Sequence, residues 1–276
     1  MSRSAKYEFA LQEPALALAP VFLALQKKRG RAKLDVTSSF GQSQLRWRGA
    51  DALGIGDQSV FLGLLAIAAQ QKLRLDTSNP GKRFGVRLMT QLGFEGAHEV
   101  TELFVLRATW SEIALAAGSR SVGGKNRKDA QMAVRRFAET TLWERRDNKE
   151  YACRILSWLI GDDDSVFIAL NPRATTALLG GQYCHISLVE RRGISGEPGK
   201  ALHAWLCANL RPGRTRRYAV DGLQVHVWGG LSTGTTLRNR RSRLVKAILH
   251  IGKLDKWRCE FIEDGMVEIE RIAPGR

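Results

Sequence analysis

The same order of predicted elements occurs twice along the 276-residue chain, and this repetition limits the fold more than any other feature. In each half a helix, a polar turn and a second helix precede a β-hairpin, which is the order of a winged helix-turn-helix domain. The sequence therefore predicts an α+β fold with two tandem winged helix-turn-helix domains and an N-terminal arm. In the first half we expect a helix over 109–118 capped by Thr109, a turn over 119–124, a helix over 125–142, and strands over 143–146, 151–160 and 166–170.

The second half repeats this order without obvious sequence identity to the first. Its hairpin is marked by Asp264-Gly265, because Asp-Gly is favoured in tight β-turns. The expected elements are a helix over 199–210, a strand over 216–220, a short helix over 221–227, a turn over 229–233, a long helix over 234–251, and strands over 257–262 and 266–272.

These patterns divide the chain into three regions. Residues 1–33 form an arm that ends in a basic cluster, residues 34–190 the first winged-helix domain, and residues 191–276 the second. The boundary is placed near Glu190–Pro198, where Gly and Pro interrupt the periodicity. The basic cluster comprises Lys27, Lys28, Arg29, Arg31 and Lys33.

The first domain opens with elements that precede the repeated pattern. A mostly apolar helix is expected over 57–70, with Asp57 as its N-cap. Residues 76–99 are rich in Gly, Ser, Asn and Pro and are expected to be mostly loop. Strands are expected over 34–40, 44–48 and 102–108.

The chain carries a large excess of positive charge. It has 43 Lys and Arg residues against 27 Asp and Glu residues, a formal net charge of +16. Because such an excess repels itself in a folded chain, we expect a polyanionic partner, either nucleic acid or an anionic membrane surface.

The sequence argues against a membrane protein or an exported one. No apolar run approaches the roughly 18 residues of a membrane-spanning helix. The apolar segment Ala15–Leu25 contains Pro20 and precedes the basic cluster, so we interpret it as a docking segment for a partner and not as a signal peptide. The four cysteines form no CxxC pair, which indicates reduced thiols in a bacterial cytoplasmic protein rather than zinc ligands.

No motif supports catalysis. The five histidines are scattered and form no HExxH motif. Gly193–Ala201 resembles a phosphate loop, but Ile194 and Ala201 stand where that loop needs Gly and Ser or Thr. Asp162–Asp164 lies between two strand-like runs and favours a hairpin turn over a metal site. We therefore expect no enzyme, cofactor or metal, and a metal-dependent nuclease using Asp162–Asp164 is an alternative.

The helix expected over 234–251 has the pattern of a DNA recognition helix. One side is an apolar stripe that includes Leu237 and Leu244, while from Gly234 to Arg258 eight basic residues stand against one acid. Asn239 and Arg243 are the expected base readers, since Asn can pair bidentately with adenine and Arg with guanine. Arg241 lies on the inward side and is expected to be structural. The predicted DNA-binding residues of this half are Thr235, Thr236, Arg238, Asn239, Arg240, Ser242, Arg243, Lys246 and Arg258.

The helix expected over 125–142 has a weaker form of this pattern. Ala130, Val134 and Phe137 face inward, and Glu139 adds an acid to the outer side. A Pro-Gly loop of the second half carries further arginines, which would grip phosphates or simply be solvated. The predicted DNA-binding residues in these two segments are Lys125, Lys128, Gln131, Arg135, Arg214, Arg216 and Arg217.

Several stretches, in order along most of the chain, resemble the RepC replication initiators of IncQ-type plasmids. They are Leu18–Leu25, Lys33–Thr37, Gly63–Ala68, Ala169–Pro172, Gly180–Ser187 and Thr235–Arg243. The resemblance implies a protein that binds direct repeats (iterons) in a plasmid origin, promotes melting of adjacent AT-rich DNA and helps to load a plasmid-encoded helicase, with a plasmid primase following. It also implies that the second domain is the main sequence reader and that the first adds DNA contacts or a homodimer interface.

Two other classes of protein share parts of this pattern. A winged-helix transcriptional repressor has the same domains and binds an operator, and it differs from an initiator mainly in its target. A basic membrane-surface or RNA-binding protein would have a similar charge, but readers of single-stranded RNA need aromatic stacking platforms. The tryptophans, such as Trp110 and Trp205, lie mostly in apolar periodic contexts that are typical of a core.

Overall fold

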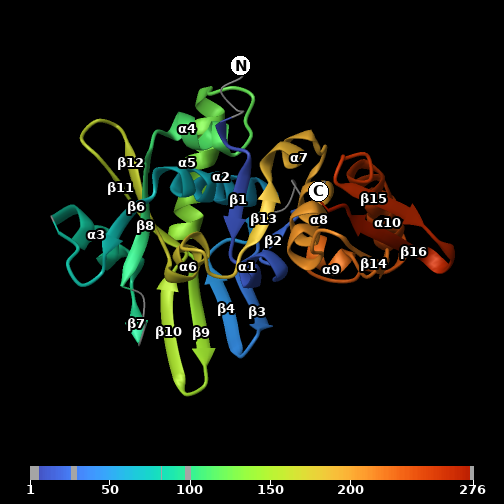
Figure 1. The fold of residues 1–276 in the computed structure, drawn as a ribbon, viewed down its shortest axis with the longest axis horizontal. Coiled ribbons are helices and arrows are strands. Elements are labelled where there is room, and N and C mark those ends of the chain that lie inside the picture. The colour runs from blue at the N-terminus through green and yellow to red at the C-terminus, as the bar shows by residue number, and fades with distance from the viewer. Residues whose placement is uncertain (1–5, 26–29, 82, 97–100, 274–276) are drawn as a thin grey trace.

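The computed structural model describes residues 6–25, 30–81, 83–96 and 101–273, and it has the α+β fold that the sequence predicts (Figure 1). The larger half of the molecule comprises the described residues before position 188. Helix α2 (Ile55–Gln71) forms its centre and is buried along most of its length. A helix that is apolar on almost every side needs neighbours all round it. Gly63 permits the close approach of α4, because a Cβ there would lie 2.9 Å from the backbone of Ala116.

A five-stranded sheet, in the order β3-β4-β9-β10-β7, lies below this core, and its two long hairpins project from the body (Figure 1). Apolar side chains alternate along its strands, so one face packs on the core and the other faces solvent. The strands are β3 (Leu34–Phe40), β4 (Ser43–Gly49), β9 (Thr141–Arg146), β10 (Lys149–Arg154) and β7 (Glu95–Gly96).

A four-stranded sheet, in the order β11-β12-β8-β6, completes the larger half together with four helices. Its strands are β6 (Leu73–Asp76), β8 (Glu102–Ala108), β11 (Leu156–Ile160) and β12 (Val166–Leu170). The helices are α3 (Arg83–Leu92), α4 (Trp110–Ala116), α5 (Gly124–Ala138) and α6 (Pro172–Leu178).

The smaller half packs three helices on a three-stranded sheet in the order β14-β16-β15. Trp205 contacts the ring of Tyr218 edge-on and stacks on His226, which fixes α8 against β14 and α9. The elements are α8 (Glu197–Asn209), β14 (Arg214–Ala219), α9 (Gln224–Trp228), α10 (Gly234–Ile251), β15 (Trp257–Phe261), the 3₁₀ turn η2 (Glu263–Gly265) and β16 (Met266–Arg271).

The N-terminal segment is part of the core over its described residues. Ala15, Val21 and Phe22 are buried, so most of the apolar segment expected to dock a partner is covered by the rest of the chain. Lys27, Lys28 and Arg29 lie outside the described residues. The segment contributes β1 (Phe9–Gln12), which pairs with β13 (Cys184–Ser187), α1 (Pro14–Leu18), and β2 (Phe22–Leu23), which pairs with β5 (Leu53–Gly54).

The two halves meet at α7 (Leu188–Gly193). Buried Arg191 donates hydrogen bonds to the Gln58 side chain at 2.8 Å and to the Lys200 carbonyl at 2.6 Å. One residue thus joins α2 of the larger half to α8 of the smaller half. Glu190 also accepts hydrogen bonds from His203 and Trp257 at 2.8 and 3.2 Å, which ties α7 to β15.

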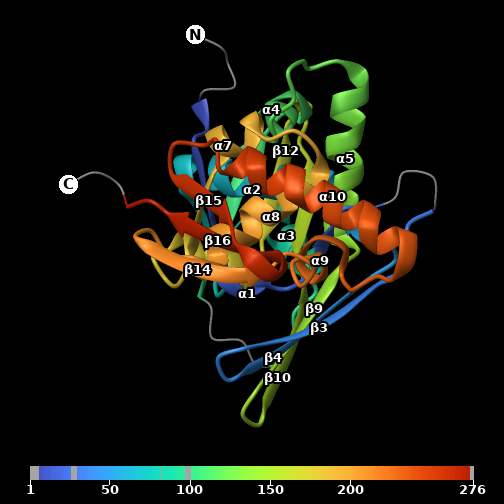
Figure 2. The ribbon, with the colours of Figure 1, turned by 90° about the vertical axis from the view of Figure 1, so that its right-hand side faces the viewer.

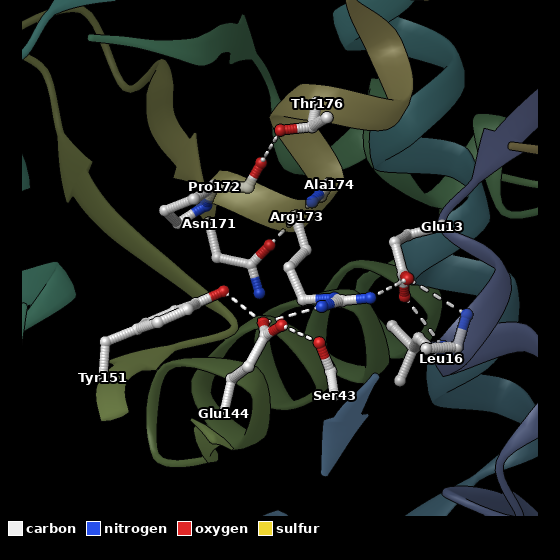
Figure 3. Close-up of polar contacts among 11 residues, drawn as sticks. Glu13, Leu16, Ser43, Glu144, Tyr151, Asn171, Pro172, Arg173, Ala174 and Thr176 are labelled. Atoms are coloured by element: carbon white, nitrogen blue, oxygen red, sulfur yellow. Dashed lines mark hydrogen bonds and ion pairs between the residues drawn. The ribbon is translucent and has the colours of Figure 1, made fainter. Parts of the chain in front are cut away.

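A buried ionic network fastens the five-stranded sheet to α1 and α6 (Figure 3). The guanidinium of Arg173 lies 2.5 Å from a carboxylate oxygen of Glu13 and 2.6 Å from one of Glu144. Glu13 also accepts from the backbone N–H groups that begin α1, and Glu144 accepts from the hydroxyls of Ser43 and Tyr151. Every carboxylate oxygen in the network therefore has a donor, as a buried charge requires.

Three expectations about the helices and loops of the larger half are wrong. Asp57 is not the N-cap of α2, because the helix begins at Ile55 and Asp57 accepts the Gly54 N–H from inside the first turn. Residues 76–99 are not mostly loop, because they contain α3, whose apolar face packs on β11. Helix α5 ends at Ala138 rather than Leu142, since Thr141 already starts β9.

Candidate nucleic-acid interface

Helix α10 has the two-sided character expected of a recognition helix, and its bounds agree with the prediction. Leu244, Ile248 and Ile251 are fully buried against the smaller half. Arg240 is half-buried, and the other predicted residues on this helix are exposed: Thr235, Thr236, Arg238, Asn239, Ser242, Arg243 and Lys246. The exposed side therefore presents guanidinium, amide and hydroxyl groups that can hydrogen-bond base edges and phosphates.

An aromatic ring beneath α10 orders two of its arginines. The guanidinium groups of Arg240 and Arg243 lie 5.1 and 5.5 Å from the ring centroid of Trp228, at the end of α9. Arg240 also donates to the Gly230 carbonyl at 3.1 Å, and burial and the nearby Arg243 lower its pKa. Trp228 was missed by the sequence analysis, and the only local signal was an aromatic residue directly before the Gly229-Gly230 turn.

Arg241, which was expected to lie on the inward side, is exposed in the structure. Its guanidinium lies 3.7 Å from a carboxylate oxygen of Asp221. The side chain thus links α10 to the chain just before α9, on the other side of the helix from Asn239. The turn before α10 is closed by Ser232, which donates to the Gln224 side chain at 2.6 Å.

Helices α4 and α5 form the corresponding pair in the larger half. Thr109 caps α4 by accepting the Glu112 N–H, as predicted, and Asn126 closes the turn by donating to the Ser121 carbonyl at 2.8 Å. Arg136 secures α5 to α2 through Asp57 at 2.5 Å. Lys125, Lys128 and Arg135 are exposed, and Gln131 is half-buried.

Arg214, Arg216 and Arg217 lie on strand β14 and not in a Pro-Gly loop, because the strand expected over 216–220 begins two residues earlier, at Arg214. Arg214 and Arg216 point to one face of the strand and Arg217 to the other, because side chains alternate along a strand. Arg217 pairs with Glu268 at 2.8 Å, and Arg258 pairs with Glu270 at 3.0 Å. These two cations are partly neutralised within the exposed face of the sheet.

The segment Asp162–Asp164, considered above as an alternative metal site, connects two strands. These are the antiparallel strands β11 and β12, and Asp163 contacts Ser165 and Arg107. The Ser165 hydroxyl and Arg107 lower the pKa of the Asp163 carboxyl. Within the described part of the chain, no three His, Cys, Asp or Glu side chains are grouped to hold a metal ion. No helix there is long and apolar enough to cross a membrane.

The fold and this surface define a class: an α+β protein with an exposed basic helix in each half. Two crystal structures of RctB domains 2 and 3 share the fold, one at 9% identity over 91% of this chain and 95% of the other with a TM-score of 0.53. The second matches at 10% identity over 94% and 96% with a TM-score of 0.52.

The family is defined by sequence. The profile of the replication protein C (RepC) family matches residues 5–273, and the chain belongs to this family. The resemblance inferred from the ordered stretches is therefore confirmed. Among curated protein sequences, no significant match was found.

Proposed function

We propose that the chain is a plasmid replication initiator that binds direct repeats in the origin, promotes melting of the adjacent AT-rich DNA and helps to load a plasmid-encoded helicase. Its partners are double-stranded origin DNA, the helicase, the primase that follows and a second copy of the chain. It is not an enzyme, needs no cofactor or metal, and acts in the bacterial cytoplasm.

The exposed side of α10 carries the proposal. Asn239 and Arg243 lie one turn apart on this side, and Arg243 is held over Trp228. A planar donor group that is already ordered loses less conformational entropy when it pairs with a base. Arg238, Ser242 and Lys246 flank these two side chains as phosphate contacts.

We further propose that residues 34–190 and 191–276 are two winged helix-turn-helix domains that read one face of a duplex. In each part a helix pair is followed by an antiparallel hairpin, α4–α5 by β9–β10 and α9–α10 by β15–β16. In Figure 1 helices α5 and α10 lie apart along the longest axis of the molecule. In Figure 2 α5 and the N-terminal turns of α10 both lie on the right-hand side of the molecule. This arrangement suits successive major grooves about 10 base pairs apart. Several bound copies would bend the origin and strain flexible TA-rich steps, which aids melting without hydrolysis.

The test is binding of the full chain to duplexes selected from a random library, measured at about 150 mM salt. We expect the selected duplex to bind about 10³-fold more tightly than a scrambled one, and Asn239→Ala with Arg243→Ala to abolish the difference. Arg241→Gln is the matched control, because it removes one charge from the same helix at a residue that pairs with Asp221 on the side away from Asn239. Equal, strongly salt-dependent binding to both duplexes would contradict the proposal.

The selected sequence separates the two regulatory classes. Tandem direct repeats beside AT-rich DNA in the plasmid support an initiator. An inverted repeat over a promoter overturns that role in favour of a transcriptional repressor.

A further inference from the structure

The solvent-facing side of the five-stranded sheet, here called the outer sheet face, is a second surface with the chemistry of a nucleic-acid site. Arg46 on β4 is the register partner of Trp143 on β9, and Gln44 is the partner of Arg145. Register partners point to the same side of an antiparallel sheet. Arg46, Gln44 and Arg145 are exposed and Trp143 is half-buried, whereas the residues between them are buried, so this side faces solvent.

A shallow hollow of about 440 Å³ lies in this face. Trp143 forms part of its lining, with the guanidinium of Arg48 5.8 Å from the ring centroid. Thr37, Gln44 and Glu150 add a hydroxyl, an amide and a carboxylate to the same lining.

The arginines beside the hollow are held in place. Arg46 makes two hydrogen bonds to Asp35, at 2.8 and 2.7 Å, and Arg48 lies 3.7 Å from the same carboxylate. Because Asp35 lies at the end of the face nearest the body, it orients both guanidinium groups beside the tryptophan. Asp35 is thus a positioning residue for a cationic rim around an aromatic ring.

This set of groups fits an unpaired nucleotide. Indole rings stack on base faces, arginines contact phosphates, and amide and carboxylate groups hydrogen-bond base edges. In a duplex the base faces are covered by their neighbours, so a ring on the protein surface can stack only on an unpaired base. The corresponding exposed face of β14-β16-β15 also carries arginines in ion pairs, Arg217 and Arg258, but it lacks an aromatic ring among its described side chains.

We propose that the outer sheet face binds a single strand of nucleic acid, with one base stacked on Trp143. Arg46, Arg48 and Arg145 contact the backbone on either side of that base. This site is separate from α10 and does not depend on repeat recognition.

The test measures binding of the full chain to a labelled single-stranded oligonucleotide of about 12 nucleotides, in DNA and RNA versions of one sequence. Trp143→Ala is expected to weaken binding about 5- to 150-fold, with Trp143→Phe retaining most of it. Arg74→Gln is the matched control for the loss of an arginine charge. Like Arg48 over Trp143, Arg74 lies 5.8 Å from the centroid of an aromatic ring, that of Phe104, but on another sheet. Arg145→Gln, at an exposed position, tests the site without altering the half-buried tryptophan.

The duplex selected for α10 provides the second readout. The proposal requires that Trp143→Ala and Arg145→Gln weaken single-strand binding but keep the affinity for the duplex within about twofold of the native value. Comparison of the DNA and RNA oligonucleotides then identifies the preferred kind of strand. An equal fall with both ligands would make the face a duplex phosphate contact and overturn the proposal. Unchanged single-strand binding in both variants would also overturn it, whatever α10 binds.

Discussion

Replacing Arg173 with methionine is expected to lower the free energy of unfolding by about 3–5 kcal/mol at pH 7. Its two carboxylate partners are almost covered, with side-chain exposures of 10% for Glu13 and 7% for Glu144. An exposed ion pair is worth about 0–1 kcal/mol, but removing one partner of a buried pair leaves an uncompensated charge, and here two carboxylates lose their shared cation. At about 2–4 °C per kcal/mol, the melting temperature should fall by about 6–20 °C.

The effect of Arg173→Met depends on pH in a defined direction. Burial alone would raise the pKa of Glu144, but hydrogen bonds from Arg173, Ser43 and Tyr151 outweigh it and hold that pKa below the ordinary 4.5. A carboxylate with a lowered folded pKa contributes stability above its unfolded pKa, and this stability is lost as pH falls through the folded value. The gap between the native protein and the variant should therefore be largest near pH 7 and shrink below about pH 4.5.

Urea unfolding followed by circular dichroism measures both quantities. Arg74→Met is the control, because its pair with Glu102 is exposed and should contribute less than about 1 kcal/mol. Adding Glu13→Gln and Glu144→Gln to Arg173→Met should recover part of the loss, since the variant then buries no unpaired charge. A loss below about 1 kcal/mol, or a gap that does not change with pH, would refute the reasoning.

Two further predictions concern Trp228 and His203. Trp228→Ala should weaken binding to the selected duplex by about 5- to 30-fold, because two cation–π contacts of about 0.5–1 kcal/mol each no longer order Arg240 and Arg243. Fluorescence anisotropy measures this affinity, and Trp228→Phe should bind nearly as tightly as the native protein. An alanine variant with the affinity of the native protein would contradict the role assigned to the ring. Burial alone would lower the pKa of His203, but Cys207 and the Glu190 carboxylate raise it to about 9. A raised folded pKa contributes stability below the unfolded value of about 6.5 that is lost as pH rises to about 9. Urea unfolding over this range should show that decline in the native protein and a smaller one in His203→Gln, and identical pH profiles would argue against a charged His203.

Elements with a strong local pattern could be predicted from the sequence. Helix α10 and strand β8 have the predicted bounds. For α10 the reason is an apolar stripe at the helical period between Gly234 and Gly252. The outward positions of Asn239 and Arg243 followed from the helical period alone.

Features that depend on tertiary contacts could not be predicted in this way. The run 151–160 was expected to be one strand, but it divides at Ile155 into β10 and β11, which enter different sheets. The backbone of Ile155 bonds to Thr140 and Asn171, and neither contact is visible in the local pattern. The stacking of α10 arginines on Trp228 likewise requires the docking of α9 beside α10.

The pairing of β1 with β13 has a consequence for how the chain folds during synthesis. Phe9 is the register partner of Ser187, so two residues that must pair lie 178 positions apart in the sequence. At about 5–20 residues per second, a ribosome needs roughly 10–35 s to make the partner strand after the first has been translated. The N-terminal segment also has a contact that forms later still, because the Ala24 N–H donates a hydrogen bond to the Val227 carbonyl. Through this interval the N-terminal segment can pack on α2, as Phe22 does on Phe61, but the part of its native cover that β13 and α9 supply is not yet made.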